Sequence, residues 1–134
     1  MRGGRRDVGC LIFAPLDQAK RVEGVVKTMP AIPRVVAAQR RAAFDKQCAF
    51  FNTFEAMGGA GAMKQWFNMR PRLAMGDFRH ATPAGYEVIG NMFYKALLAG
   101  FASYLSERDS ESESAAPRPN PSSNAPNNTS PNRS

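Results

Sequence analysis

The chain has 134 residues, with 18 Lys and Arg against 11 Asp and Glu, and a formal net charge of +7. Its length allows at most one domain of ordinary size. A basic balance permits weak contact with nucleic acid or anionic surfaces. However, pairs such as Arg5-Arg6 and Arg40-Arg41 are not interleaved with aromatic residues. We therefore expect a solvated basic surface and no specific nucleic-acid partner.

No apolar run approaches the roughly 20 residues that a membrane-spanning helix needs. The basic N-terminus is followed by an apolar segment, residues 8–14, that is short for the core of a signal peptide. With a single histidine and no clustered cysteines, no metal site is expected. The sequence thus calls for neither a membrane span nor a cofactor, and it leaves localisation and oligomeric state open.

The first predicted element is a strand at residues 8–14. This run is continuously apolar and ends at Pro15, which is typical of a strand buried on both faces in a parallel sheet covered by helices. Residues 16–30 are predicted to be a loop, because Gly24 and Pro30 interrupt regular structure.

A helix and a second strand follow. Residues 34 to 47 show the spacing of an amphipathic helix, and residues 48–52 are predicted as a short strand. A helix followed by a strand, after an earlier buried strand, favours an α/β protein with a parallel sheet. Cys10 and Cys48 each fall in a predicted strand, so we expect both to be buried free thiols.

The segment at residues 53–69 is first rich in glycine and then in aromatic residues. Gly58 and Gly59 permit backbone conformations that other residues resist. Phosphate binding is disfavoured, because neither Gly-x-Gly-x-x-Gly nor a Walker lysine pattern is present. We favour a substrate-side loop that contains Gly58 and Gly59 and is packed by Trp66, with plain core packing of Trp66 as the alternative.

The clearest predicted helix spans residues 82 to about 105. Thr82 is expected at its N-cap and Pro83 at its first position, where the missing N–H costs nothing. A broad apolar stripe is expected to pack against the sheet; it comprises Val88, Ile89, Met92, Phe93, Ala96, Leu97, Gly100, Phe101 and Tyr104. Residues 107–134 have no large apolar residue, so we predict a disordered tail after a domain at 1–106.

The only histidine, His80, follows Asp77 by three residues and directly precedes this helix. An imidazole can take and return a proton near neutral pH. A nearby carboxylate can accept the Nδ1 proton and fix the tautomer. The alternative is a capping loop with a chance Asp and His, and the spacing alone would favour it, because Asp-x-x-His is common.

Further residues around this pair carry a resemblance to a known family. Asp-x-x-His followed by Thr-Pro-x-Gly-Tyr, at residues 77–86, resembles the last catalytic block of the SGNH (GDSL-type) ester hydrolases. Residues 56–66 are similar to a segment of the branch related to carbohydrate and peptidoglycan O-acetyl esterases. Residues 10–17 look like an earlier strand and loop of those enzymes. The resemblance covers roughly residues 8–105.

The resemblance implies a fold, a chemistry and a substrate class. The fold would be the C-terminal part of a flavodoxin-like three-layer α/β/α sandwich with a parallel sheet, here incomplete. Asp77 and His80 would be the acid and the base of a Ser-His-Asp triad. The substrate would be an acyl ester, with an O-acetyl group on a glycan favoured, and such enzymes are often secreted or periplasmic.

The nucleophile of that triad is missing. Residues 1–102 contain no serine, and the Gly-Asp-Ser block and the two oxyanion-hole blocks of the family are absent. We interpret the chain as the C-terminal portion of such a hydrolase, through truncation, a split gene or a misplaced start. Cys10 and Cys48 are nucleophile candidates in principle, although both are placed mid-strand.

A non-catalytic remnant or interaction module on the same α/β scaffold is the alternative function, and nucleic-acid binding ranks last. A sheet that lacks its centre is expected to expose apolar edges and faces.

Overall fold

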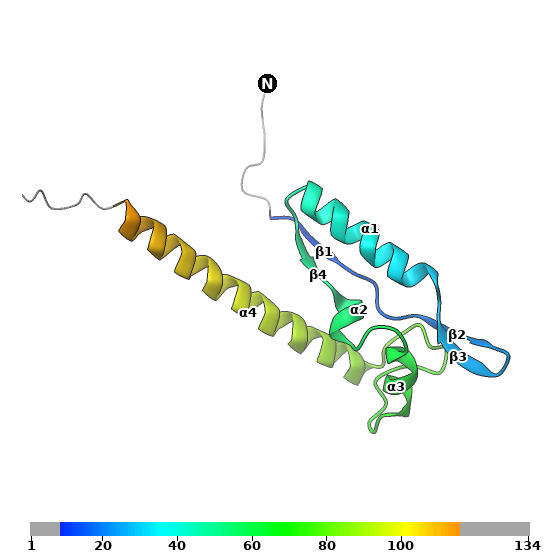
Figure 1. The fold of residues 1–134 in the computed structure, drawn as a ribbon. Coiled ribbons are helices and arrows are strands. Elements are labelled where there is room, and N and C mark those ends of the chain that lie inside the picture. The colour runs from blue at the N-terminus through cyan, green and yellow to red at the C-terminus, as the bar shows by residue number, and fades with distance from the viewer. Residues whose placement is uncertain (1–8, 116–134) are drawn as a thin grey trace, which may run out of the picture. The chain divides into compact units, whose positions relative to one another are not determined.

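The computed structural model describes residues 9–115. Contacts within the chain divide it into two compact units, one up to Leu98 and one from Ala99. The elements, shown in Figure 1, are the strands β1 (Leu11–Phe13), β2 (Ala19–Val22), β3 (Val25–Thr28) and β4 (Ala49–Phe51) and the helices α1 (Ala31–Asp45), α2 (Thr53–Ala56), α3 (Ala62–Asn68) and α4 (Pro83–Ser114). The protein is thus a mixed α/β structure with a long C-terminal helix.

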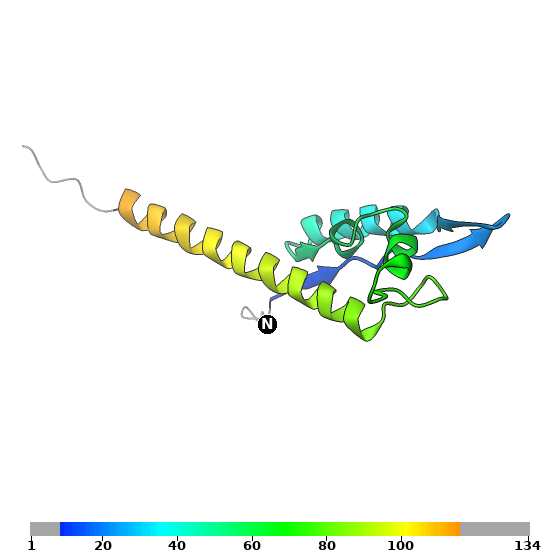
Figure 2. The same cartoon turned by 90° about the horizontal axis from the view of Figure 1, so that it is seen from below.

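The predicted parallel pairing of the first and second buried strands is confirmed. β1 and β4 run parallel, with Leu11 opposite Ala49 and Phe13 opposite Phe51. Successive side chains of a strand point to opposite faces, and the two faces have different neighbours. On one face, Phe50 packs against a cluster that includes buried residues of α1. On the other face, the rings of Phe13 and Phe51 contact Phe93 of α4. Figures 1 and 2 show α1 and the start of α4 on opposite sides of this sheet.

The expectation that the first strand is buried on both faces is wrong. Leu11 is 42% exposed and Phe13 is 44% exposed. Among the described residues, β1 and β4 pair only with each other, and Phe93 covers Phe13 with a single ring at 4.7 Å between centroids. A two-stranded sheet has too few neighbours to remove these side chains from water.

α1 begins three residues before the predicted start, because Pro33 lies inside its first turn rather than ahead of it. The backbone N–H groups of that turn have no partner within the helix, so proline is tolerated there. The buried face consists of Ile32, Val36 and Ala43. The amphipathic character is therefore confirmed, although Val35 is 42% exposed.

The loop predicted at residues 16–30 is in large part a β-hairpin. β2 and β3 pair antiparallel with Val22 opposite Val25, and the two residues between them, Glu23 and Gly24, have φ of 51° and 80°. Two left-handed residues are what a tight type I′ hairpin turn requires. Gly24 therefore does not end regular structure, as its residue type predicts, but allows the chain to reverse between two strands.

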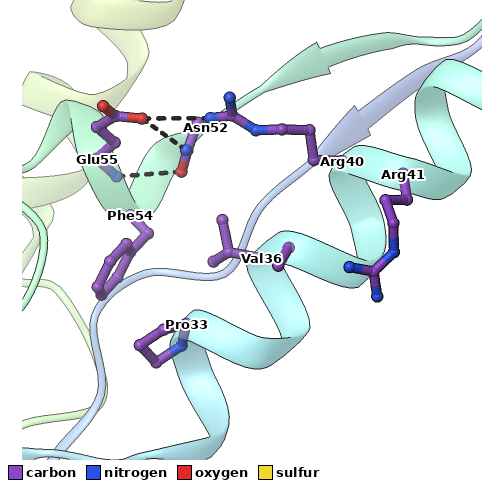
Figure 3. Close-up of a pocket in the computed structure, with 8 residues that line it drawn as sticks. Pro33, Val36, Arg40, Arg41, Asn52, Phe54 and Glu55 are labelled. Atoms are coloured by element: carbon purple, nitrogen blue, oxygen red, sulfur yellow. Dashed lines mark hydrogen bonds and ion pairs between the residues drawn. The ribbon is translucent and has the colours of Figure 1, made fainter.

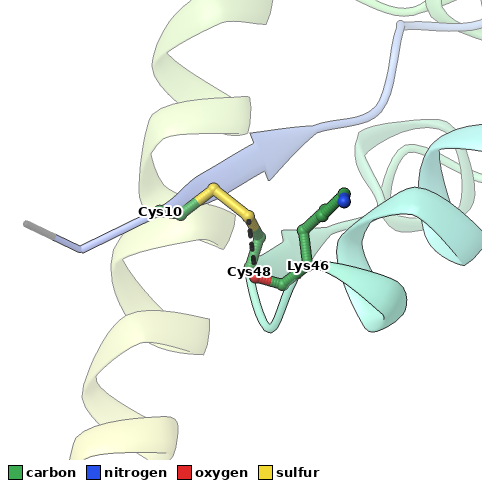
Figure 4. Close-up of a disulfide and its surroundings, with 3 residues drawn as sticks. All are labelled: Cys10, Lys46 and Cys48. Atoms are coloured by element: carbon green, nitrogen blue, oxygen red, sulfur yellow. Dashed lines mark hydrogen bonds between the residues drawn. A yellow bond between two sulfur atoms is a disulfide. The ribbon is translucent and has the colours of Figure 1, made fainter. Parts of the chain in front are cut away.

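The two cysteines form a disulfide bond, with a Cα–Cα distance of 4.7 Å (Figure 4), so the expectation of buried free thiols is wrong. The register of the parallel strands explains the bond. Leu11 lies opposite Ala49, and the residues just before them are therefore neighbours as well. Cys10 is exposed and Cys48 half-buried, so the bond closes the start of the sheet from outside the core.

The main core cluster lies between the hairpin, α3 and the start of α4. Its buried members are Ala19, Met57, Ala62, Met63, Trp66 and Ala74, and Val88, Ile89 and Met92 pack against it. α3 contacts β3 of the hairpin (Figure 2). Core packing of the α4 stripe is thus confirmed for its first turns.

The later part of α4 departs from the prediction in two ways. Later residues of the apolar stripe are not buried: Leu97, Phe101 and Tyr104 are each more than half exposed. The helix also runs to Ser114, so the first residues of the expected tail are helical, while residues 116–134 of that tail lie outside the described residues. No helix within residues 9–115 is long and apolar enough to cross a membrane.

Candidate functional site

The loop between α3 and α4 is a compact, closed structure. Ala74 and Ala81 form a β-bridge across it. Three further backbone hydrogen bonds hold it: Thr82 N–H to the Leu73 carbonyl at 2.9 Å, Met75 N–H to the His80 carbonyl at 2.8 Å, and Phe78 N–H to the Met75 carbonyl at 3.1 Å. The backbone at His80 is therefore fixed from both sides of the loop.

The predicted helix cap at the end of this loop is confirmed. The Thr82 hydroxyl accepts the Gly85 backbone N–H at 3.1 Å and donates to the Arg72 carbonyl at 2.7 Å. Gly85 is buried, and a Cβ at this position would lie 2.0 Å from the Leu73 carbonyl oxygen. Only glycine therefore lets the first turn of α4 approach the loop so closely.

The predicted contact between Asp77 and His80 is also confirmed. Asp77 Oδ2 lies 2.6 Å from His80 Nδ1. Its other oxygen, Oδ1, accepts the backbone N–H groups of Arg79 at 2.9 Å and His80 at 3.1 Å. One carboxylate thus binds both the backbone of the loop and the imidazole, which restricts the rotation of the ring.

These hydrogen bonds stabilise the ionised form of the Asp77 carboxyl group. The His80 side chain first, and then the backbone N–H groups of Arg79 and His80, lower the pKa of Asp77 from 3.8 to about 2. The carboxylate is therefore ionised at neutral pH, and the proton in the 2.6 Å contact belongs to His80 Nδ1. When the ring is neutral, Nε2 is left unprotonated, which is the state that a general base requires.

The pair is open to solvent in the described structure. The His80 side chain is 64% exposed and the Asp77 side chain 44% exposed. A reactant could therefore reach the imidazole without a movement of the loop.

The loop is hydrogen-bonded to the start of β2. After β1 the chain passes to Ala19, whose N–H donates to the Phe78 carbonyl at 2.8 Å. Phe78 itself has a left-handed φ of 55°, so the backbone turns sharply between Asp77 and His80.

Sequence reasoning missed Asp17, which ties the segment between β1 and β2 to α3. Its side chain is completely buried. Oδ2 accepts the Met63 backbone N–H at 3.0 Å, while Oδ1 has no hydrogen-bond partner among residues 9–115. The carboxylate therefore ties the segment after β1 to the start of α3, two residues before Ala19 contacts the loop. An acid soon after a strand-ending proline was the available signal, because polar residues at the carboxyl ends of buried strands often belong to sites.

The predicted substrate-side residues are not brought together as one surface. Gly58 and Gly59 have φ of 121° and 72°, which confirms that the loop uses the conformational freedom of glycine. Trp66 is only 4% exposed and belongs to the core cluster. The alternative, core packing, therefore holds for Trp66, and a substrate role for the two glycines stays a prediction.

The first unit offers no obvious nucleophile among its described residues. Residues 9–98 contain no serine, and the hydroxyls of Thr28 and Thr82 are engaged with backbone groups. Thr53 is buried. Cys10 and Cys48 are joined in a disulfide, so neither can supply a thiolate while that bond is intact.

A cavity of about 550 Å³ lies between α1 and the end of β4 (Figure 3). Its charged residues are partly neutralised. Arg40 Nη2 lies 3.3 Å from Glu55 Oε2, and Asn52 donates to the same oxygen at 2.9 Å. Across residues 9–115, no group of three His, Cys, Asp or Glu side chains could hold a metal ion.

Comparison of the chain with family models, curated proteins and solved structures gives no match to any of them. A function for this chain is therefore argued from its own residues and from the geometry of the Asp77–His80 pair.

Proposed function

We propose that this chain supplies the base and the orienting acid of an ester hydrolase of the SGNH type, whose serine nucleophile comes from residues outside this sequence. The observation that carries the proposal is the 2.6 Å contact between Asp77 Oδ2 and His80 Nδ1 in a loop closed by backbone hydrogen bonds. The layers formed by α1, the parallel sheet and the start of α4 support the corresponding fold, a flavodoxin-like α/β/α sandwich present in part.

In this proposal His80 first acts as a general base. Nε2 removes the proton from the incoming serine hydroxyl while the serine oxygen attacks the ester carbonyl. The imidazolium then returns the proton to the departing alkoxide. Asp77 stays ionised throughout and stabilises the imidazolium through the Nδ1 hydrogen bond. Water then attacks the acyl-enzyme with the same proton transfers through His80, and the free carboxylic acid is released. The favoured acyl group is an acetyl group from a glycan.

The proton position can be tested on the chain itself. His80 is the only histidine, so long-range ¹H–¹⁵N spectra contain one pair of ring nitrogens. We expect the neutral ring to carry its proton on Nδ1. Asp77→Asn should reduce the population of this tautomer, whereas Asp45→Asn, which removes an equal charge from the exposed end of α1, should not. A neutral ring protonated on Nε2 would contradict the proposal.

The catalytic role needs a nucleophile. The isolated chain should show no turnover of an aryl acetate above background, because nucleophile, base and oxyanion donors act as a unit. Fusion to an upstream segment that contains a Gly-Asp-Ser block should produce activity. His80→Ala in that fusion should lower the rate by about 10²–10⁴-fold, the range for general acid–base catalysis. Turnover by the isolated chain that disappears in His80→Ala would show that the nucleophile lies within this sequence.

The second candidate function is a non-catalytic interaction module on the same scaffold. It is favoured by the absence of serine from residues 1–102 together with the disulfide that occupies both cysteines. The genomic sequence immediately upstream separates the two candidates, because an in-frame Gly-Asp-Ser block supports the hydrolase and its absence supports the module.

A further inference from the structure

A second cavity, of about 270 Å³, borders the loop that carries the Asp77–His80 pair. It lies between the β2–β3 hairpin and α3, and its lining includes Arg21, Lys64, Phe67 and Phe78. Phe78 stands between Asp77 and His80 in the chain, so a ligand in this cavity would lie against the loop that holds the imidazole. The volume is just below the roughly 300 Å³ at which small-molecule sites begin, which suits a single sugar unit.

The cavity is basic. Within the described part of the chain, none of its lining residues is Asp or Glu, and neither Arg21 nor Lys64 forms an ion pair. Residues 19–28 and 62–82 contain seven Lys and Arg against two acids, a net charge of +5. One of these acids, Asp77, is occupied by His80. Arg21 Nη1 donates to the Gly24 carbonyl at 3.1 Å, so an anion entering the cavity would meet two cations that no carboxylate of the described residues neutralises.

Two phenylalanine rings complete the wall. The centroids of Phe67 and Phe78 lie 5.0 Å apart in an edge-to-face arrangement, and the Arg72 guanidinium lies 4.2 Å from the Phe67 centroid. Apolar rings offer a surface to the C–H groups of a pyranose ring, while lysine and arginine bind a carboxylate through charge-assisted hydrogen bonds. A site with both features should bind an acidic sugar more tightly than a neutral one.

We propose that this cavity binds an acidic sugar unit of the ester substrate, with the sugar carboxylate at Arg21 and Lys64 and the ring against Phe67 and Phe78. The inference rests on the proposed function for its link to catalysis. The larger cavity beside α1 is a poorer candidate for an acidic ligand, because Glu55 lines it and neutralises Arg40 at 3.3 Å.

Binding can be measured on the full chain without any nucleophile. The probes are trigalacturonate and the neutral maltotriose, followed by ¹H–¹⁵N NMR shifts and calorimetry at fixed ionic strength. We expect trigalacturonate alone to shift signals of the hairpin, α3 and Phe78. Lys64→Gln and Arg21→Gln should each weaken its binding by about tenfold, because each removes a charge-assisted hydrogen bond. Both side chains are exposed, so these variants should fold normally.

The matched control is Arg41→Gln, which removes one exposed cation from the other cavity and should leave the affinity unchanged. Equal binding of maltotriose would overturn the proposal. So would an equal loss in Arg41→Gln, which would indicate attraction by net charge alone, or tighter binding of a single-stranded oligonucleotide at the same site. Failure of this test leaves the histidine tautomer experiment unaffected, so the two proposals can fail separately.

Discussion

Gly85→Ala should destabilise the protein, although alanine normally favours a helix. The added Cβ would lie 2.0 Å from the Leu73 carbonyl oxygen and 3.0 Å from the Ala81 Cβ. Two of the three nearest atoms belong to the Leu73 backbone, so no side-chain rotation relieves the clash and α4 must move away from the loop. Overpacking of this kind costs about 1–3 kcal/mol, which exceeds the gain of up to about 1 kcal/mol in helix propensity.

Gly90→Ala is the matched control in the same helix. No atom of the described residues lies within 4 Å of the position that a Cβ of residue 90 would take, and Gly90 is exposed. The substitution should therefore raise the free energy of unfolding by up to about 1 kcal/mol. Urea unfolding followed by the fluorescence of Trp66, the only tryptophan and 4% exposed, measures both variants. The two substitutions are expected to have opposite signs.

The same change should disturb the site. The Leu73 carbonyl that would be displaced also accepts the Thr82 N–H at 2.9 Å, and Thr82 follows His80 by two residues. The Nδ1 proton of His80 should therefore exchange faster with water in Gly85→Ala. Its exchange rate should be unchanged in Gly90→Ala. Equal stabilisation by the two substitutions would refute the close approach of α4 to the loop, and with it the physical reason for a glycine at residue 85.

Two further predictions concern the disulfide and acid stability. Replacing both Cys10 and Cys48 by serine should lower the free energy of unfolding by about 4 kcal/mol, because the bond closes a loop with a sequence separation of 38; urea curves that are unchanged by the double substitution or by reductant would contradict this. Folding lowers the pKa of Asp77 from 3.8 to about 2, so the unfolded chain binds more protons in this range, and the stability contributed by Asp77 should be lost as the pH falls from about 4 to about 2. Asp77→Asn should remove that part of the acid profile, and identical profiles for both proteins would count against it.

Local signals in the sequence were sufficient for several parts of the structure. Thr82 and Pro83 mark a helix start whose cap involves residues only three apart. Asp77 and His80 are equally close in sequence, so their 2.6 Å contact needs only a short closed loop. The helix at Ala31–Asp45 and the strand after it follow from hydrophobic spacing within single segments. In each case the responsible interactions lie within one turn or one element.

The tertiary structure alone decided the features that join distant segments. Cys10 meets Cys48 because β1 and β4 pair in one register across a separation of 38 residues, and a shift of one residue would part them. Asp17 is buried because it reaches Met63, 46 residues away. The exposure of Leu11 and Phe13 depends on how many neighbours the sheet has, and the burial of Trp66 depends on the core cluster against which α4 residues such as Val88 and Ile89 pack. Hydrophobic pattern shows which side chains prefer to leave water, whereas only the assembled neighbours determine which of them do.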